Sequence, residues 1–281
     1  MSVAGLFVGL ATLDVVQLVD RVPGTNEKTT AQATWLAAGG PAAVAAITFA
    51  ALGGRPRLWT ALGNASAARL AAADLEAAGV ELVDVAPPGF ELAVSTVFVN
   101  AATGERAVVS GAGHTPVLGK IAGPDLAGID VVLVDGHHAA LARSAALAAS
   151  GIPVVVDAGS HKPVFDDIFA FATDVICSAD YVHPAGLDPR GLLALGPRCV
   201  VVSHGGAALD WWMPEAAGSL TPESVVARDT TGAGDVLHGA YCHALASGRD
   251  RVAALESAVA VATERVRHLG PFTWREAIGP H

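Results

Sequence analysis

The chain has 281 residues, of which 52% are hydrophobic and 5% aromatic, and its formal net charge is −10. This length and apolar content can bury a substantial core, so we expect a single domain over residues 1–281. Binding to a nucleic-acid backbone needs a basic surface, and a pI near 5.4 therefore argues against a nucleic-acid partner. A small phosphorylated ligand is not excluded, because backbone amides and a metal ion can hold phosphate on an acidic protein.

The three cysteines, Cys177, Cys199 and Cys242, form no close pair in the sequence, which indicates neither a disulfide framework nor a zinc site. The apolar start at Met1–Leu13 lacks the basic residues of a secretory signal and predicts a first strand. Residues 35–54 carry no charge over a length that would suit a membrane span. Their glycines, Pro41 and many alanines favour a buried helix instead. We therefore expect a cytoplasmic protein with no membrane partner.

Short apolar runs alternate with alanine-rich helical patterns along most of the chain. The runs predict buried strands at Val3–Val8, Arg57–Ala61, Val131–Val134, Val154–Val156, Val175–Cys177 and Cys199–Val202. The patterns between them predict helices at Ala42–Leu52, Ser66–Ala78, Ala139–Ala149, Val164–Phe171 and Val236–Ala246. This order is typical of an α/β fold with a doubly wound, mostly parallel sheet, helices on both faces, and ligands at the carboxyl ends of the strands.

Two segments, at about 15–35 and 91–110, break this alternation. The first has strand-like runs on either side of Pro23-Gly24, and the second has them on either side of Ala101–Gly104. Both patterns predict β-hairpins inserted between the α/β units.

The run Asp229–Asp235, D-T-T-G-A-G-D, stands directly before the last predicted helix. The first N–H groups of a helix lack internal partners and carry the positive end of its dipole, so Gly232, Ala233 and Gly234 would let a phosphate approach closely. The negative charge of Asp235 could be there only to interact with the positive end of the helix dipole, an interaction that stabilises a helix by about 0.3–1 kcal/mol. An acidic side chain beside a phosphate cradle also suits phosphoryl transfer, in which it takes the proton of the attacking hydroxyl.

This run resembles the signature of the ribokinase-like carbohydrate kinases. The match continues after it, at Val236, His238, Gly239 and Ala240. The resemblance implies that Asp235 is the catalytic base, that the three small residues before it form an anion hole, and that the cofactors are ATP and Mg²⁺. It also implies that the two hairpins form a small lid over a sugar substrate, with a possible homodimer through the lid. Gly-Gly-Pro-Ala at 39–42 and the D-V-L-H-G-A continuation resemble most the fructokinase, ketohexokinase and sulfofructose kinase branch.

The resemblance implies a set of substrate contacts. Asp14, after the first strand, would accept hydrogen bonds from sugar hydroxyls, and Gly39 and Gly40 would let the backbone approach the sugar. Lys28 in the first hairpin would face a substrate phosphate or sulfonate. His137 and His138 follow the strand that ends at Asp135, at the rim where the substrate would lie, and we expect one of them, His137, to bond the sugar. The structural alternatives are a strand-end aspartate, a helix-entry loop, a solvated lysine on a sheet edge, and a helix-start histidine with local partners.

Nucleotide contacts are implied at Ser203 and Gly205, which resemble the family's nucleotide loop although Ala208 replaces a glycine usual there. Thr230 and His238 are further candidates on the nucleotide side. For His238, packing at a helix interface is the alternative.

Metal sites are less clearly marked. The resemblance implies a potassium ion near Asp229 and Thr231. The family's Asn-x-x-Glu motif near magnesium is reduced to Ser178 and Tyr181, so no protein ligand for Mg²⁺ is predicted. Magnesium held by ATP oxygens and waters is compatible with its chemistry.

We therefore expect ATP-dependent phosphorylation of a primary hydroxyl of a sugar or sugar derivative, of the ketose type. A nucleoside kinase and a catalytically silent binding protein of the same fold are the alternatives. A dinucleotide-binding oxidoreductase is disfavoured, because Leu10–Asp14 and a hairpin follow the first strand in place of a Gly-x-Gly-x-x-Gly turn.

Overall fold

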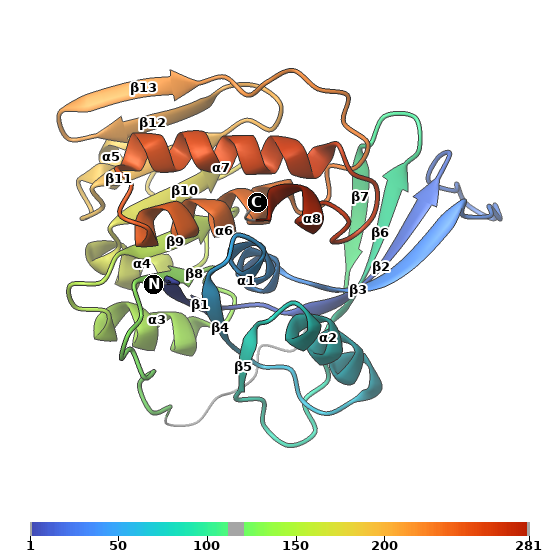
Figure 1. Cartoon of the computed structure of the whole chain (residues 1–281), viewed down its shortest axis with the longest axis horizontal. Helices are drawn as coiled ribbons and strands as arrows, with labels where there is room; N and C mark the ends of the chain where they lie inside the picture. The colour runs from blue at the N-terminus through green and yellow to red at the C-terminus, as the bar shows by residue number, and fades with distance from the viewer. Residues whose placement is uncertain (1, 112–120, 280–281) are drawn as a thin grey trace.

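A nine-stranded sheet forms the centre of the computed structural model, which describes residues 2–111 and 121–279 (Figure 1). Its strands are β1 (Ala4–Val8), β4 (Arg55–Thr60), β5 (Glu81–Asp84), β8 (Val131–Val134), β9 (Val154–Ala158), β10 (Asp174–Ser178), β11 (Cys199–Ser203), β12 (Leu209–Met213) and β13 (Ala216–Leu220). They are ordered β13-β12-β11-β10-β9-β8-β1-β4-β5. The pairs from β5 to β11 are parallel, and β12 and β13 add an antiparallel edge.

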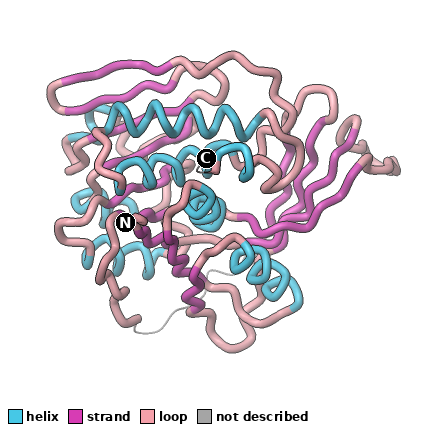
Figure 2. The backbone as a smooth tube through the Cα atoms, viewed as in Figure 1, coloured by secondary structure: helices cyan, strands magenta, loops and turns pink. Residues whose placement is uncertain are grey.

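Helices cover both faces of this sheet (Figure 2). They are α1 (Pro41–Ala51), α2 (Ser66–Ala77), α3 (Ala139–Ala148), α4 (Phe165–Ile168), α5 (Pro189–Leu193), α6 (Ala233–Ala246), α7 (Arg251–Val266) and α8 (Arg275–Ile278). Side chains alternate along each strand, so Phe7 enters the core under α1, α2, α6 and α7, whereas Leu6 and Val8 enter the core under α3, α4 and α5. The doubly wound α/β fold predicted from the sequence is confirmed.

A second sheet, the lid sheet, projects from one side of the body (Figure 1). It contains β2 (Thr12–Val19), β3 (Ala33–Gly39), β6 (Val94–Asn100) and β7 (Arg106–Ser110), in the order β3-β2-β6-β7. The two predicted hairpins are present, and parallel pairing of β2 with β6 joins them into one sheet. The structure corrects two boundaries: Thr29–Gln32 is not part of a strand, and the strand predicted from Val15 begins at Thr12, so that Asp14 lies inside β2.

The six predicted core strands and the five predicted helices are present, with shifted ends. The pattern at 164–171 divides into α4 and a short 3₁₀ turn, Phe169–Phe171, and α6 begins at Ala233, earlier than predicted. None of the helices in the described ranges combines the length and apolarity that crossing a membrane requires.

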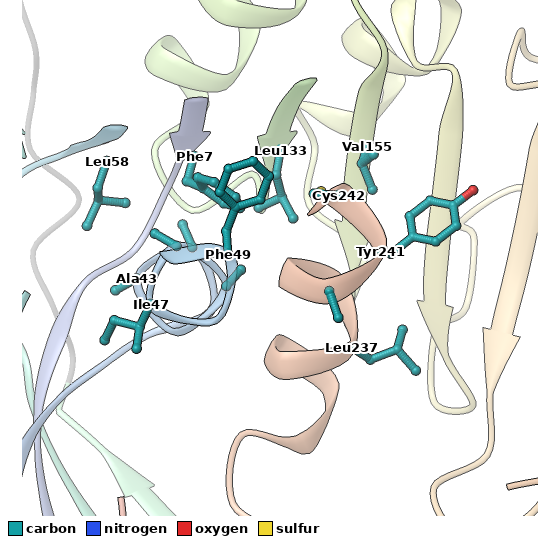
Figure 3. Packing of buried hydrophobic residues seen from close by; sticks show 14 of the residues in the cluster. Phe7, Ala43, Ile47, Phe49, Leu58, Leu133, Val155, Leu237, Tyr241 and Cys242 are labelled. Atoms are coloured by element: carbon teal, nitrogen blue, oxygen red, sulfur yellow. The ribbon is translucent and has the colours of Figure 1, made fainter. Parts of the chain in front are cut away.

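The crossing of α1 and α6 is important for the site, because the first turns of both helices border it. Gly239 lies at this crossing, and an added Cβ there would stand 2.3 Å from the carbonyl oxygen of Ala45 and 2.7 Å from the Cβ of Thr48. Figure 3 shows the core around the crossing, with Ala43, Ile47, Phe49, Leu237, Tyr241 and Cys242. The glycine therefore sets how closely the two helices pack.

Candidate active site

A cavity of about 270 Å³ lies between the lid sheet and the first turns of α1 and α6. The lid sheet contributes Asp14, Ser95 and Arg106 to its wall. The body contributes Gly40, His137, Thr231, Gly232 and Asp235. Residues far apart in the sequence thus meet at the carboxyl end of β1, where a doubly wound sheet places its ligands.

Asp14 extends from β2 into the cavity, and its Oδ1 accepts a hydrogen bond of 2.7 Å from the Thr12 hydroxyl. Burial raises the pKa of this carboxyl, and hydrogen bonds from Thr12 and Ser95 oppose the rise. Gly39 leaves room for it, because a Cβ on Gly39 would lie 2.1 Å from Asp14 Oδ2. Gly39 does not itself line the cavity, whereas Gly40, with φ of 96°, does.

Asp135 is buried behind the cavity wall, and the sequence did not suggest a role for it. Its Oδ2 accepts hydrogen bonds from the amides of Leu10 at 2.8 Å and Ala42 at 3.3 Å, and its Oδ1 accepts one from the His137 amide at 2.9 Å. One buried carboxylate therefore ties the end of β1 to the start of α1 and places His137 on the cavity wall.

The first turn of α6 presents free amides to the cavity. Gly232, with φ of 69°, is the N-cap in the left-handed region that glycine adopts readily. Among the described residues, the amides of Gly232, Gly234 and Asp235 have no hydrogen-bond acceptor, while the Ala233 amide donates to Thr230 O at 3.4 Å. This geometry fits the predicted anion cradle.

Asp235 lies in this first turn, partly accessible from the cavity. Its pKa is raised to about 8, chiefly by burial and then by the negative charge of Asp157, while the positive charge of Arg106 opposes the rise. A carboxylate with a pKa near the working pH is suited to accept a proton in catalysis. Arg106 on the lid sheet was not singled out in the sequence analysis.

Asp157, at the end of β9, and His238, one helical turn after Asp235, complete a cluster with Asp235. One potential ligand atom from each lies within 4.8 Å of the others. His238 Nδ1 is 3.5 Å from Asp157 Oδ2, the residue is 7% exposed, and neither of its ring nitrogens has a hydrogen-bond partner in the described structure. His238 thus faces a carboxylate pair rather than only a helix interface.

The other predicted nucleotide contacts lie outside the cavity. Ser203 ends β11, where its hydroxyl donates to Cys177 O at 3.3 Å, and Gly205 follows in a turn with φ of 62°. Thr230 has a different contact: its amide and its hydroxyl both donate to Gly104 O, each at 3.0 Å. Gly104 belongs to the β6–β7 turn, so Thr230 joins the lid sheet to the loop before α6.

Three further predicted residues have surroundings that the sequence did not reveal. Lys28 is exposed in the β2–β3 loop and does not line the cavity. Asp229 is fully buried, and its carboxylate pairs with the guanidinium of Arg265 on α7. Thr231 lines the cavity, and its amide donates to Asp229 Oδ1 at 2.8 Å.

The chain is similar to known proteins over nearly its whole length. The model of the family described as pfkB family carbohydrate kinase matches residues 6–275. A crystal structure of a "putative ribokinase" from Agrobacterium tumefaciens is 27% identical with a TM-score of 0.88, and the match covers 99% of this chain and 96% of that one. Ribokinase from Thermotoga maritima is 23% identical with a TM-score of 0.81, over 99% and 98% of the two chains. Ribokinase from Arabidopsis thaliana, complexed with ribose and ATP, is 20% identical with a TM-score of 0.76, also over 99% and 98%.

Proposed function

Because the chain belongs to the pfkB family of carbohydrate kinases, we propose that it transfers the γ-phosphoryl group of ATP to a primary hydroxyl of a sugar or sugar derivative, of the ketose type. One observation carries the proposal: a single cavity holds Asp14 on its lid side and Asp235, beside the free amides of α6, on its body side. An acceptor hydroxyl, a base and a phosphate cradle can therefore meet in one place.

The roles follow from the positions of the side chains. Asp14 accepts hydrogen bonds from the acceptor's hydroxyls, and such charge-assisted bonds favour a polyol over an apolar ligand. Asp235 takes the proton of the attacking hydroxyl, and the amides at the start of α6 stabilise the charge on the moving phosphoryl group. His137 lines the same cavity, where its imidazole can bond the sugar.

A divalent cation fits between the carboxylates of Asp157 and Asp235, each of which offers an oxygen within 4.8 Å of the other. Magnesium prefers oxygen ligands and usually keeps several waters. We therefore assign the carboxylate of Asp157 to hold Mg²⁺ together with ATP oxygens. The ion would supply positive charge to the transferring phosphate.

The outer face of the lid sheet supports the predicted homodimer. Val15, Leu36, Thr96 and Val109 lie in register across its four strands, on the face turned away from the cavity. Leu36 is 54% exposed and Val109 is 66% exposed. Exposed apolar side chains such as Leu36 and Val109 are typical of an interaction surface, and a second copy of the lid sheet would present the same two side chains.

Release of ADP over a panel of ketoses, other sugars, phosphosugars and nucleosides tests the proposal, in the presence of MgATP. We expect turnover with a ketose-type sugar and a loss of about 10²- to 10⁴-fold in kcat in Asp235→Asn, with ATP still bound. Asp167→Asn is the matched control, because this carboxylate is exposed on α4, away from the cavity. Turnover of nucleosides alone would make the chain a nucleoside kinase, and ATP binding without any turnover would make it a silent binding protein.

A further inference from the structure

A buried arginine is bonded to the loop that precedes the phosphate cradle. Arg265, near the end of α7, is 3% exposed, and its Nη2 lies 3.0 Å from Oδ2 of Asp229, which has no exposed surface. Its Nη1 donates to two carbonyl oxygens, Asp229 O at 3.3 Å and His268 O at 2.9 Å. One guanidinium thus binds a carboxylate and two carbonyls, which are the oxygens a bound cation would use.

The remaining bonds of Asp229 are made within the protein. Its Oδ1 accepts the amide of Thr231 at 2.8 Å, and its Oδ2 also accepts the amide of Gly270 at 3.1 Å. The end of α7 adds a further bond, because the Arg228 amide donates to Val266 O at 2.7 Å. The loop is therefore held from both sides immediately before Gly232, the N-cap of α6.

The family resemblance implied a potassium ion at Asp229 and Thr231, and the residues present do not fit one. A second positive charge beside the buried guanidinium would be repelled, since charges at a few ångströms interact strongly away from water. If the guanidinium moved away, the buried carboxylate of Asp229 would be left without a cationic partner, because the described structure offers it no other one. Its planar fork also matches a carboxylate better than a spherical ion does.

We propose that Arg265 is a positioning residue that takes the place of a monovalent metal ion, so that phosphoryl transfer by this protein does not depend on potassium. The inference rests on the proposed kinase function. Arg265 acts through Asp229 and Thr231, and in this way it fixes the direction in which the first amides of α6 point. A permanent charge supplied by the chain removes the need to recruit one from solution.

The test uses the wild-type protein first. ADP release is measured with Tris-ATP and MgCl₂ in choline chloride, sodium chloride or potassium chloride at equal ionic strength. We expect rates within about twofold of one another, since no potassium ion contributes to the reaction. A tenfold higher rate in potassium chloride would mean that potassium stabilises the transition state by about 1.4 kcal/mol. A rise of tenfold or more that is specific for potassium would overturn the proposal.

A second readout does not need an acceptor sugar. The thermal unfolding midpoint of the wild-type protein is compared in the same three salts. A bound ion would stabilise the folded state by mass action and raise the midpoint. Since we propose that no potassium ion binds, we expect no rise specific to potassium. A potassium-specific rise would overturn the proposal even if no kinase substrate had been found. Absence of turnover in every salt, without such a rise, would contradict the kinase function and not the cation assignment.

Variants separate positioning from stability. Arg265→Met should lower kcat by about 10²-fold at temperatures where it stays folded, because small misplacements of a reacting group have effects of this size. Arg265→Lys should recover part of the rate by restoring the charge. Arg251→Met is the matched control: Arg251 Nε also bonds a buried carboxylate, Asp174 Oδ1 at 2.7 Å, but far from the cavity. Its kcat should change less than about twofold, and equal kcat losses in both methionine variants would reduce Arg265 to a structural role.

Discussion

Replacing Gly239 by alanine tests whether the close packing of α1 and α6 builds the site. The new Cβ would lie 2.3 Å from Ala45 O and 2.7 Å from Thr48 Cβ, whereas nonbonded carbon atoms prefer about 3.5–4.0 Å. The helices must therefore separate by about 1 Å, and overpacking of this kind costs about 1–3 kcal/mol. Alanine's better helix propensity returns at most about 1 kcal/mol. Subtracting this gain from the middle of the packing range leaves an expected net destabilisation of about 1 kcal/mol.

The free energy of unfolding is measured by urea titration, and the midpoint temperature by calorimetry. Each kcal/mol should lower the midpoint by about 2–4 °C in a protein of nearly this size. The matched control is Gly234→Ala in the same helix, where an added Cβ meets no atom within 4 Å, so its stability should not fall. At temperatures where Gly239→Ala is still folded, its kcat should be lower than that of the wild type, since both helices border the cavity. Wild-type stability and kcat in Gly239→Ala would refute the argument from packing.

Two further predictions concern pH and assembly. Asp235 must be ionised to accept a proton, so with a pKa of about 8 we expect kcat/KM to rise about tenfold from pH 7 to pH 8.5 and then to level off. Arg106→Gln should move this rise to higher pH, because it removes a positive charge that lowers the pKa of Asp235, whereas an unchanged profile in this variant would contradict the assigned cause. Leu36→Glu and Val109→Glu should convert a wild-type dimer into a monomer in light scattering after gel filtration; a wild-type protein that is monomeric at micromolar concentration would disprove the lid interface.

The fold was largely predictable because its parallel strands are buried on both faces and appear as continuous apolar runs. The hairpin of β12 and β13 was missed, since an antiparallel edge has half-exposed strands without such a run. The strand β5 was missed for the same reason, because it is a short edge strand with exposed ends. Pairing of β2 with β6 was also not predictable, because it is a long-range contact between segments whose local patterns show only hairpins.

The position of the candidate site was predictable where its residues form one continuous run, as at Asp229–Asp235 at the start of α6. The candidate site was less predictable where strands far apart in the sequence each contribute a single side chain. Asp135 and Asp157 each stand at the carboxyl end of an apolar strand, a signal that the sequence did contain. Arg106 and Arg265 carried no such signal, because an arginine on a strand or helix is most often solvated, and only the fold shows what it faces.

The two hydrogen bonds from Thr230 to Gly104 O have a mechanical consequence. They cross from the turn of the β6–β7 hairpin to the segment that leads into α6, and Gly104 fits so tightly that a Cβ would lie 2.7 Å from Ala227 O. The hairpin cannot hinge over an acceptor without carrying that segment along or breaking both bonds. If the two sides of the cavity bind the proposed acceptor and phosphate, we expect their occupancies to be energetically linked, and thermodynamics requires such a linkage to act equally in both directions.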